Sequence, residues 1–334
     1  MHILLTGASG FVGSHVLRHL LMNTDARITC PVSFRHKGIS PRISAAIDST
    51  PSGMQRTTLE MLDLTAPIDR VTRSRIGPVD FILNVASESH VDRSITHPGQ
   101  FISNNVQLIL NMLDYAREVR PRMFLHMSTD EVYGPAYGEH RHAEGEPHRP
   151  SNPYSASKAA QEAIVFSYWR TYGVPAVITN TMNIIGETQD PEKFVPKTIR
   201  AIVNREPVTV HVSPEGVPGS RFYLHARNLA DAWLHLIRTH TPQMYPEHMD
   251  LSRFNIVGER EVSNVELVQM IASYLGKTAK IEPVDFHTSR PGHDLRYALD
   301  GTKIAQTGWS APVPLESSLE RTVQWTLEHP EWMA

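Results

Sequence analysis

The sequence predicts an α/β fold in which a doubly wound parallel sheet is followed by a smaller C-terminal α/β lobe. Short apolar runs without strict alternation recur through the first 180 residues, and segments with helical spacing separate them. Such runs are typical of parallel strands that helices cover on both faces. Beyond about residue 180 the alternation loosens, and proline and glycine become frequent. We therefore expect residues 1–180 to form one domain and residues 181–334 mainly a second lobe, with the chain free to cross between them.

The individual elements follow from these runs and from residue spacing. Five stretches have the apolar, β-branched character of buried strands: 2–7, 26–32, 80–86, 122–128 and 175–180. Five stretches have apolar residues at helical spacing: 12–23, 105–119, 154–172, 263–276 and 315–329. A third strand is expected just before the stretch "MLDL" at 61–64.

Composition excludes several functional classes. A net charge of −3 over 334 residues and a pI near 6.7 leave no basic footprint for nucleic acid. The single cysteine, Cys30, excludes an intramolecular disulfide and fits a reducing compartment. No run of about 18 apolar residues is present, so we expect no membrane span. The sequence thus indicates a cytoplasmic protein with a small-molecule partner.

A glycine-rich stretch, "LLTGASGFVG", joins the first strand to the first helix. Gly7, Gly10 and Gly13 permit a tight turn and close approach of the backbone to a pyrophosphate, which the helix N-terminus then attracts. Phe11 and Val12 lie in the same turn. A plain strand-to-helix turn is the alternative. The glycine-rich stretch comes directly after an N-terminal apolar strand, and this position favours the cofactor loop of a Rossmann-type domain.

The residues after the later strands leave the choice between NAD and NADP open. An acidic residue commonly follows the second strand and binds the ribose of NAD, but Ser33 and Arg35 stand there instead. They suit the extra phosphate of NADP. Asp63 and Leu64 after the third strand are candidates for the adenine, and Ala86 after the fourth completes the predicted cofactor set.

Two motifs in the middle of the chain carry candidate chemistry. In "SNPYSASK", Tyr154 and Lys158 are four residues apart and share one helix face, where an ammonium stabilises a phenolate and lowers its pKa. In "MSTDEVYG", Asp130 and Glu131 follow Thr129 at the end of a strand. Neighbouring carboxyl groups in a water-poor site favour one neutral and one ionised group.

The stretch "GEHRHAEGEPHRP" at 138–150 is rich in histidine. Its histidines lack the spacing of a helical or finger-type metal site, so we expect a mobile surface loop and no metal.

Seven stretches together show a family resemblance: "LLTGASGFVGSHV", "ASESHVDRSI", "HMSTDEVYG", "NPYSASKAA", "DPEKFVP", "RPGHDLRYALD" and "TVQWTLEHPEW". The chain resembles the extended short-chain dehydrogenases/reductases and, within them, the dTDP-glucose 4,6-dehydratases. The matching stretches cover nearly the whole length in the expected order. The wider resemblance favours NAD.

The resemblance implies a sequence of steps. Tyr154, beside Lys158, removes the O4 proton of a sugar nucleotide while C4 is oxidised, and Thr129 binds the same oxygen. Glu131 then removes the C5 proton, and protonated Asp130 donates to the departing C6 hydroxyl. Hydride returns to C6, which gives a 4-keto-6-deoxy sugar nucleotide with the cofactor restored.

The resemblance also implies a set of substrate-binding residues: Ser89, Asn183, Lys193, Arg221, Asn255, Arg290 and His293. The chain departs from the family pattern among the residues that the resemblance assigns to substrate binding. The departures are the stretch "RFYLHARNLADA" at 221–232 and Ile185. They leave the base and the hexose open. A homodimer through the helices 105–119 and 154–172 is expected from the family alone.

Two alternatives to the dehydratase remain. One is a 4-epimerase or other sugar-nucleotide oxidoreductase that uses only Tyr154, Lys158 and the cofactor. The other is a non-catalytic cofactor-binding sensor. Asp130 and Glu131 argue against the epimerase, because a simple epimerase has no elimination to drive. The presence of Thr129, Asp130, Glu131, Tyr154 and Lys158 together argues against the sensor.

Overall fold

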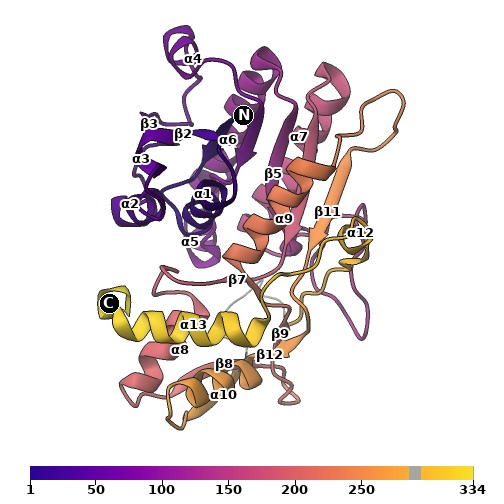
Figure 1. Cartoon of the computed structure of the whole chain (residues 1–334). Helices are drawn as coiled ribbons and strands as arrows, with labels where there is room; N and C mark the ends of the chain where they lie inside the picture. Colours follow the sequence, from indigo (N-terminus) through magenta and orange to yellow (C-terminus); the bar gives the residue numbers. More distant parts are fainter. Residues whose placement is uncertain (286–294, 334) are drawn as a thin grey trace.

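A computed structural model of the chain describes residues 1–285 and 295–333. Figure 1 shows two lobes, with a large sheet and its helices above and a smaller group of helices and short strands below. Within the described residues no helix combines the length and apolar character that crossing a membrane requires.

The large lobe is built on a seven-stranded sheet in which every pairing is parallel. Its strands are β1 (His2–Thr6), β2 (Arg27–Val32), β3 (Thr57–Met61), β4 (Phe81–Asn84), β5 (Met123–Thr129), β6 (Ala176–Thr181) and β11 (Ser252–Ile256). Their spatial order is β3-β2-β1-β4-β5-β6-β11. The order reverses between β1 and β4, and ligands of such sheets bind outside the carboxyl ends of the strands at this point.

Helices cover both faces of the sheet. Those of the large lobe are α1 (Phe11–Asn23), α2 (Ser40–Ile47), α3 (Gly53–Arg56), α4 (Arg70–Ile76), α5 (Val91–Thr96), α6 (Pro98–Val119), α7 (Pro153–Tyr172) and α9 (Ala226–Thr239). Successive side chains of β1 point to opposite faces of the sheet. Ile3 and Leu5 belong to the core under α1 and α9, whereas Leu4 belongs to the core under α6 and α7. This burial on both sides explains why the strands read as continuous apolar runs.

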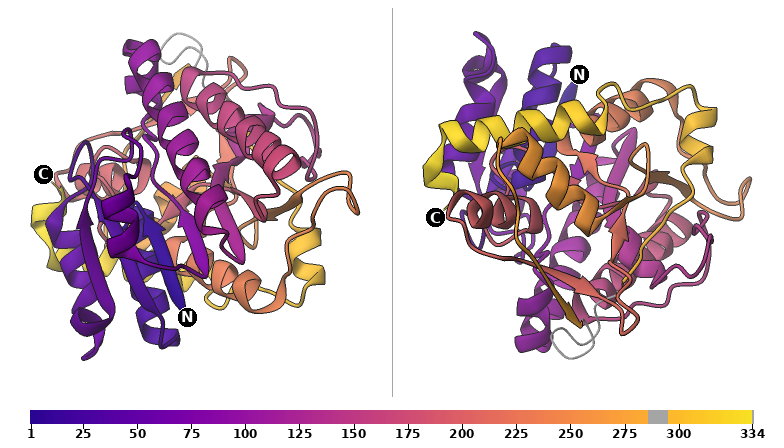
Figure 2. Two further views of the ribbon diagram at one scale, coloured as in Figure 1. Left: turned by 90° about the horizontal axis from the view of Figure 1, so that it is seen from above. Right: turned by 90° about the horizontal axis from the view of Figure 1, so that it is seen from below.

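The smaller lobe has its own apolar core. Its elements are β7 (Ile184–Ile185), α8 (Phe194–Val203), β8 (Val208–Val212), β9 (Ser220–Arg221), β10 (Leu224–His225), β12 (Val262–Ser263), α10 (Asn264–Tyr274), β13 (Ile281–Asp285), α13 (Leu315–Glu328) and η2 (Pro330–Met333). The short helix α12 (Thr302–Gln306) packs against β11 of the large sheet instead. Seen from below, α8, α10 and α13 lie side by side (Figure 2), and their apolar residues form one cluster. β8 pairs in parallel with β13 beside them.

The chain crosses between the lobes. β11 pairs with β6 at the edge of the large sheet, and α9 packs against α1. Both elements come from the C-terminal half of the sequence. Their apolar residues, among them Trp233 and Phe254, join the core of the large lobe.

The predicted strands and helices are confirmed to within a few residues, except that α6 begins seven residues earlier than expected, at Pro98. The fold class is also confirmed. The sequence did not reveal the short strands of the smaller lobe, because two-residue strands such as β7 and β9 leave no periodic signal.

Candidate active site

The glycine-rich stretch makes a close turn between β1 and α1. Gly7 has φ of +72°, and a Cβ there would lie 2.9 Å from Ala86 N. A Cβ on Gly13 would lie 2.0 Å from Gly7 O, so the first turn of α1 packs directly on the loop. Gly10 precedes α1 as its N-cap. The loop therefore presents the unpaired N–H groups of a helix N-terminus to the space in front of it.

A long cavity opens there, along the carboxyl ends of the strands. Its lining includes all residues predicted for the cofactor: Gly7, Gly10, Phe11, Val12, Gly13, Ser33, Arg35, Asp63, Leu64, Ala86, Tyr154 and Lys158. Ser89 and Lys193, predicted for the substrate, line it as well. The Lys193 ammonium donates to Ser89 O at 3.3 Å. The cavity thus runs from the loop after β2 to the helix that carries Tyr154.

The basic side chains of the loop after β2 each meet a carboxylate: Arg35 meets Asp63, His36 meets Glu88 at 3.3 Å, and Lys37 meets Glu192 at 3.1 Å. Asp63 also accepts from Thr65 N at 3.0 Å and from the Thr65 hydroxyl at 2.8 Å. Burial by itself raises the pKa of Asp63, but these bonds and Arg35 leave it below its ordinary value. Arg35 therefore faces an ionised partner.

Helix α7 carries Tyr154 and Lys158 into the cavity. It begins at a capping box, since the Asn152 side chain accepts from Ser155 N and the Ser155 hydroxyl accepts from Asn152 N. The Lys158 ammonium donates to Met127 O and to Gln161 Oε1, both at 2.6 Å.

The titration of this pair differs from the expectation. Burial lowers the pKa of Lys158 to about 7. Burial, and then the Glu131 carboxylate, raise the pKa of Tyr154. Burial thus outweighs the expected effect of Lys158 on the pKa of the phenol.

The stretch after β5 holds the two carboxyl groups in the turn η1 (Asp130–Tyr133). Thr129 caps the turn, with its hydroxyl accepting from Glu131 N at 3.3 Å. Asp130 is 4% exposed, and burial together with Glu131 raises its pKa to about 7. Asn152 Nδ2 donates to Glu131 Oε2 at 3.1 Å. The N-cap of α7 is therefore bonded to Glu131, while Asp130 keeps a substantial protonated fraction near neutral pH.

A buried charged residue supports β5 from behind. Glu162 of α7, 1% exposed, accepts from the Ser128 hydroxyl and from Asn180 Nδ2, and it pairs with Arg253. Asn180 Nδ2 also donates to Thr129 O at 3.2 Å. A buried charge with several partners fixes the groups around it. Glu162 therefore positions the residues that carry the catalytic candidates, a role that sequence reasoning missed.

Similarity to known proteins agrees with this geometry. A model described as "NAD dependent epimerase/dehydratase family" matches residues 3–251. The chain belongs to the NAD dependent epimerase/dehydratase family. It is 34% identical to the dTDP-glucose 4,6-dehydratase of Neisseria meningitidis, over 99% of this chain and 94% of that protein.

Two solved structures have the same fold. The dTDP-glucose 4,6-dehydratase of Streptomyces venezuelae, solved with NAD bound, has a TM-score of 0.86 at 29% identity, over 99% of this chain and 98% of that one. A UDP-glucuronic acid 4-epimerase from Bacillus cereus also reaches 0.86, at 21% identity over 98% of this chain and 100% of that one, and shows the fold alone.

The residues predicted for the substrate are not all gathered in one place. Arg221 is buried, donates to Ser220 O and stacks over the Tyr297 ring at 4.6 Å. Its charge also acts on Asp130. Asn183 is exposed after β6. Arg290 and His293 lie outside the described residues.

Asn255 has structural contacts. It is fully buried, and its Nδ2 donates to His142 O and Asp300 O. Asn255 N donates to Glu144 Oε1 at 2.8 Å. These bonds attach the loop 138–150 to β11, so we leave Asn255 out of the proposed substrate set.

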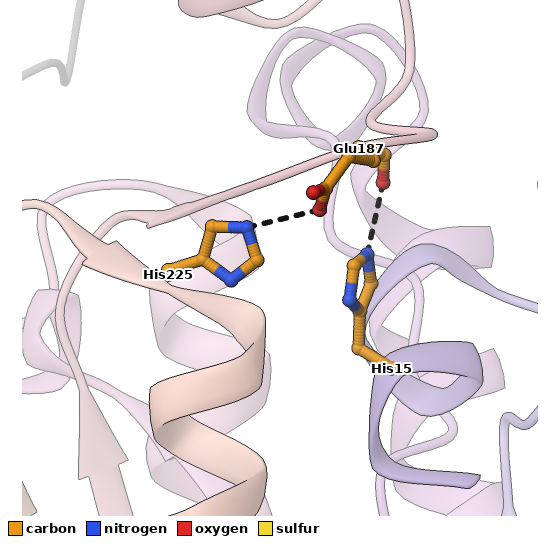
Figure 3. A group of neighbouring side chains, drawn as sticks. All are labelled: His15, Glu187 and His225. Carbon is orange, nitrogen blue, oxygen red and sulfur yellow. Dashed lines mark hydrogen bonds and ion pairs between the residues drawn. The ribbon is translucent and has the colours of Figure 1, made fainter. Parts of the chain in front are cut away.

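A polar junction joins the two lobes beside the cavity. Figure 3 shows His15 on α1, His225 at the start of α9 and Glu187 between them. His15 Nε2 bonds Glu187 O at 2.9 Å, and His225 Nε2 bonds Glu187 Oε2 at 3.0 Å. Gln189 and Asp190, two and three residues after Glu187, line the cavity. The junction thus fixes this wall against the helix of the glycine loop.

Sequence reasoning missed His15, Glu187, Asn152 and Gln161 as supporting residues. Only Asn152 had a signal, since Asn followed by Pro marks a helix start. The others depend on contacts between distant segments.

Proposed function

We propose that the chain is an NAD-dependent nucleoside-diphosphate-hexose 4,6-dehydratase, a lyase that forms a 4-keto-6-deoxy sugar nucleotide. The observation that carries the proposal is Asp130, a buried carboxylic acid whose pKa is raised to about 7 beside Glu131. An elimination needs one group that gives a proton and one that takes a proton. The relatives named dTDP-glucose 4,6-dehydratase cover the full chain and support the same activity.

The family resemblance supplies a role for each catalytic candidate, and because the pKa of Tyr154 is raised, the phenol must first lose its proton to act as a base. Tyr154 takes the proton of O4, and the Thr129 hydroxyl orients the same oxygen. Glu131 takes the C5 proton once the 4-ketone has made it acidic. Asp130 gives its proton to the C6 hydroxyl, which leaves as water, and C5 is reprotonated at the end. A bound nicotinamide supplies the acceptor for hydride from C4 and its return to C6.

The loop after β2 favours NAD over NADP. A 2′-phosphate requires free cationic partners. Arg35 is already paired with Asp63, and Lys37 with Glu192. The solved relatives carry NAD. We therefore propose that NAD is bound and recycled, with the adenine end near Asp63 and Leu64.

The sugar nucleotide is proposed to lie between the lobes. Ser89 and Lys193, which line the cavity, would contact the sugar nucleotide from one side. Arg221 and Asn183 would contact it from the smaller lobe. Arg221 is suited to the diphosphate, because a guanidinium binds phosphate oxygens in pairs. This arrangement assigns residues 1–180 mainly to the cofactor and residues 181–334 mainly to the sugar nucleotide. We also propose a homodimer through α6 and α7.

The test is turnover with a panel of dTDP-glucose, UDP-glucose, GDP-mannose and UDP-N-acetylglucosamine. The proposal predicts a product from one of them that has lost one water, detected by mass spectrometry. An isomer of unchanged mass would favour the alternative, a sugar-nucleotide 4-epimerase. Cofactor released from the purified protein by denaturation identifies NAD or NADP by mass.

A further inference from the structure

The loop between η1 and α7 brings three metal-ligating groups together. His140 Nε2 and His142 Nδ1 are 3.3 Å apart. Glu146 Oε2 lies 3.1 Å from His140 Nε2 and 2.8 Å from His142 Nδ1. The spacing His-x-His-x3-Glu gives no regular helical pattern. The turn from Ala143 to Glu146, closed by Glu146 N donating to Ala143 O at 3.4 Å, produces the convergence.

The mutual distances fit a metal ion. Donor atoms about 2.0–2.2 Å from a tetrahedral ion stand roughly 3.3 Å from one another. The three observed separations, from 2.8 to 3.3 Å, are those of the hydrogen bonds that now join the side chains, so a bound cation would replace these bonds and move the ligand atoms apart by less than about 1 Å. Imidazole and carboxylate donors suit Zn²⁺ and its first-row neighbours rather than Mg²⁺ or Ca²⁺, which take oxygen ligands.

The surrounding hydrogen bonds orient the ligands as a metal site requires. His142 Nε2 faces Pro135 O at 3.4 Å, which leaves Nδ1 as the ligand atom. A metal-bound imidazole commonly donates its other N–H to such a carbonyl. Glu146 Oε1 accepts from Ala143 N at 2.9 Å, so Oε2 points at both histidines.

We propose that His140 Nε2, His142 Nδ1 and Glu146 Oε2 bind a first-row divalent cation such as Zn²⁺. His140 is half exposed, so solvent reaches the three ligands on that side. A water molecule would therefore be the fourth ligand of the cation. The ion is not needed for the proposed dehydration. It would fasten the loop, because three ligands from one turn then share one centre.

The second group of His and Glu in the described residues is unsuited to a cation. In the junction of His15, Glu187 and His225 (Figure 3), His225 Nδ1 accepts from Arg227 N at 2.9 Å. A metal on Nε2 would then require an imidazolate. The Arg321 guanidinium also lies 2.6 Å from Glu187 Oε1, where it already neutralises the carboxylate.

The site lies close to the catalytic turn. His142 stacks on Tyr133, the last residue of η1, with ring centroids 5.4 Å apart and planes 16° apart. The backbone of His142 also bonds Ala298 O and Asp300 N. An ion at this site therefore joins the loop 135–149 to the end of η1 and to the segment before α12, and we expect it to stabilise the folded chain.

The test measures zinc affinity at pH 7 on chelator-treated protein, by competition with a chromogenic chelator. The wild type is expected to bind one Zn²⁺ per chain. His140→Ala and Glu146→Gln are each expected to weaken binding at least about tenfold. Glu139→Gln, an exposed acid in the same loop, and His248→Ala, an exposed histidine elsewhere, should bind as the wild type does.

A second readout is thermal unfolding. Zinc in excess should raise the Tm of the wild type and of both control variants, because a ligand that binds only the folded state stabilises it. The Tm of His140→Ala and Glu146→Gln should rise less at the same zinc concentration. Mg²⁺ should shift none of them. A wild type that binds no zinc, or site variants that bind it as tightly as the wild type, would overturn the proposal.

Discussion

The Thr129 hydroxyl donates a hydrogen bond of 2.9 Å to Asp130 Oδ1, while Asp130 Oδ2 is buried and has no hydrogen-bond partner among the described residues. A buried polar atom without a hydrogen-bond partner costs free energy of folding. Such atoms are typical of sites where a bound ligand supplies the missing hydrogen bond. Thr129 thus fixes one oxygen of the acid and leaves the other for a proton donated to the substrate.

Replacing the two carboxyl groups should separate elimination from oxidation. Asp130→Asn and Glu131→Gln should each lower kcat for dehydration by about 10²–10⁴, the usual contribution of general acid or base catalysis. The first oxidation at C4 should continue, because Tyr154 is intact. Single-turnover absorbance of the reduced nicotinamide should therefore show it accumulating. Glu139→Gln is the control, and dehydration at the wild-type rate in both variants would refute these roles.

The rate of dehydration should fall as pH rises through about 7. Asp130 is the proton donor, its pKa is raised to about 7 by burial and by Glu131, and only the protonated form can donate. The measurement is kcat against pH at saturating substrate. In Asp130→Asn this alkaline limb should disappear from the residual rate. A wild-type rate that is constant from pH 6 to about 9 would contradict the role of Asp130.

The same group should make the folded chain less stable at alkaline pH. The ordinary pKa of Asp130 is 3.8, and in the folded state it is about 7. Its contribution to stability is therefore complete below about pH 4 and is lost as pH rises through about 7. Relative to the wild type, Asp130→Asn should gain roughly 1–3 kcal/mol between about pH 5 and pH 8.

Thermal unfolding at the two pH values measures this difference. Asp25→Asn, an exposed aspartate in the turn after α1, is the control and should show no such gain. An Asp130→Asn variant whose Tm follows that of the wild type at both pH values would mean that burial of the acid carries no energetic cost.

The glycine loop should tolerate a methyl group at one position and not at another. Gly13→Ala places Cβ 2.0 Å from Gly7 O, so the helix or the loop must move. Gly10→Ala places it 3.2 Å from the same oxygen, which a small shift relieves. We expect Gly13→Ala to lower the affinity for NAD at least about tenfold, and Gly10→Ala to have a smaller effect. Isothermal titration of the cofactor-free protein with NAD measures both, and equal losses would contradict the packing.

Removing the partner of Arg35 should shift the cofactor preference. Asp63→Asn leaves the guanidinium without its carboxylate and free to meet a 2′-phosphate. The ratio of the Kd for NADP to the Kd for NAD should therefore fall by about tenfold or more. Asp25→Asn, an exposed aspartate in the turn after α1, is the control. An unchanged ratio would show that Asp63 does not restrain Arg35.

Local signals were enough to predict the glycine loop, the helix that carries Tyr154, and the adjacent carboxyl groups. Each depends on residues close in sequence, where turn and helix geometry act directly. The place of β11 at the edge of the large sheet was not predictable in this way, because its pairing with β6 joins segments about 75 residues apart. Glu162 was missed for the same reason, since Arg253 comes from β11.

The histidines at 140 and 142 illustrate the limit most clearly. Their spacing predicted only a loop, and the loop is present. The sequence did not predict the turn that brings the Glu146 carboxylate within hydrogen-bond distance of both histidines.

The most direct test of the account is turnover of the accepted sugar nucleotide in D2O. Hydride that leaves C4 returns to C6 without meeting solvent, whereas C5 loses its proton to Glu131 and regains one from water. The account predicts a product that has lost one water and carries a single deuterium at C5, and none in Glu131→Gln. A product of unchanged mass without deuterium would contradict it, because the chain would then only move hydride at C4.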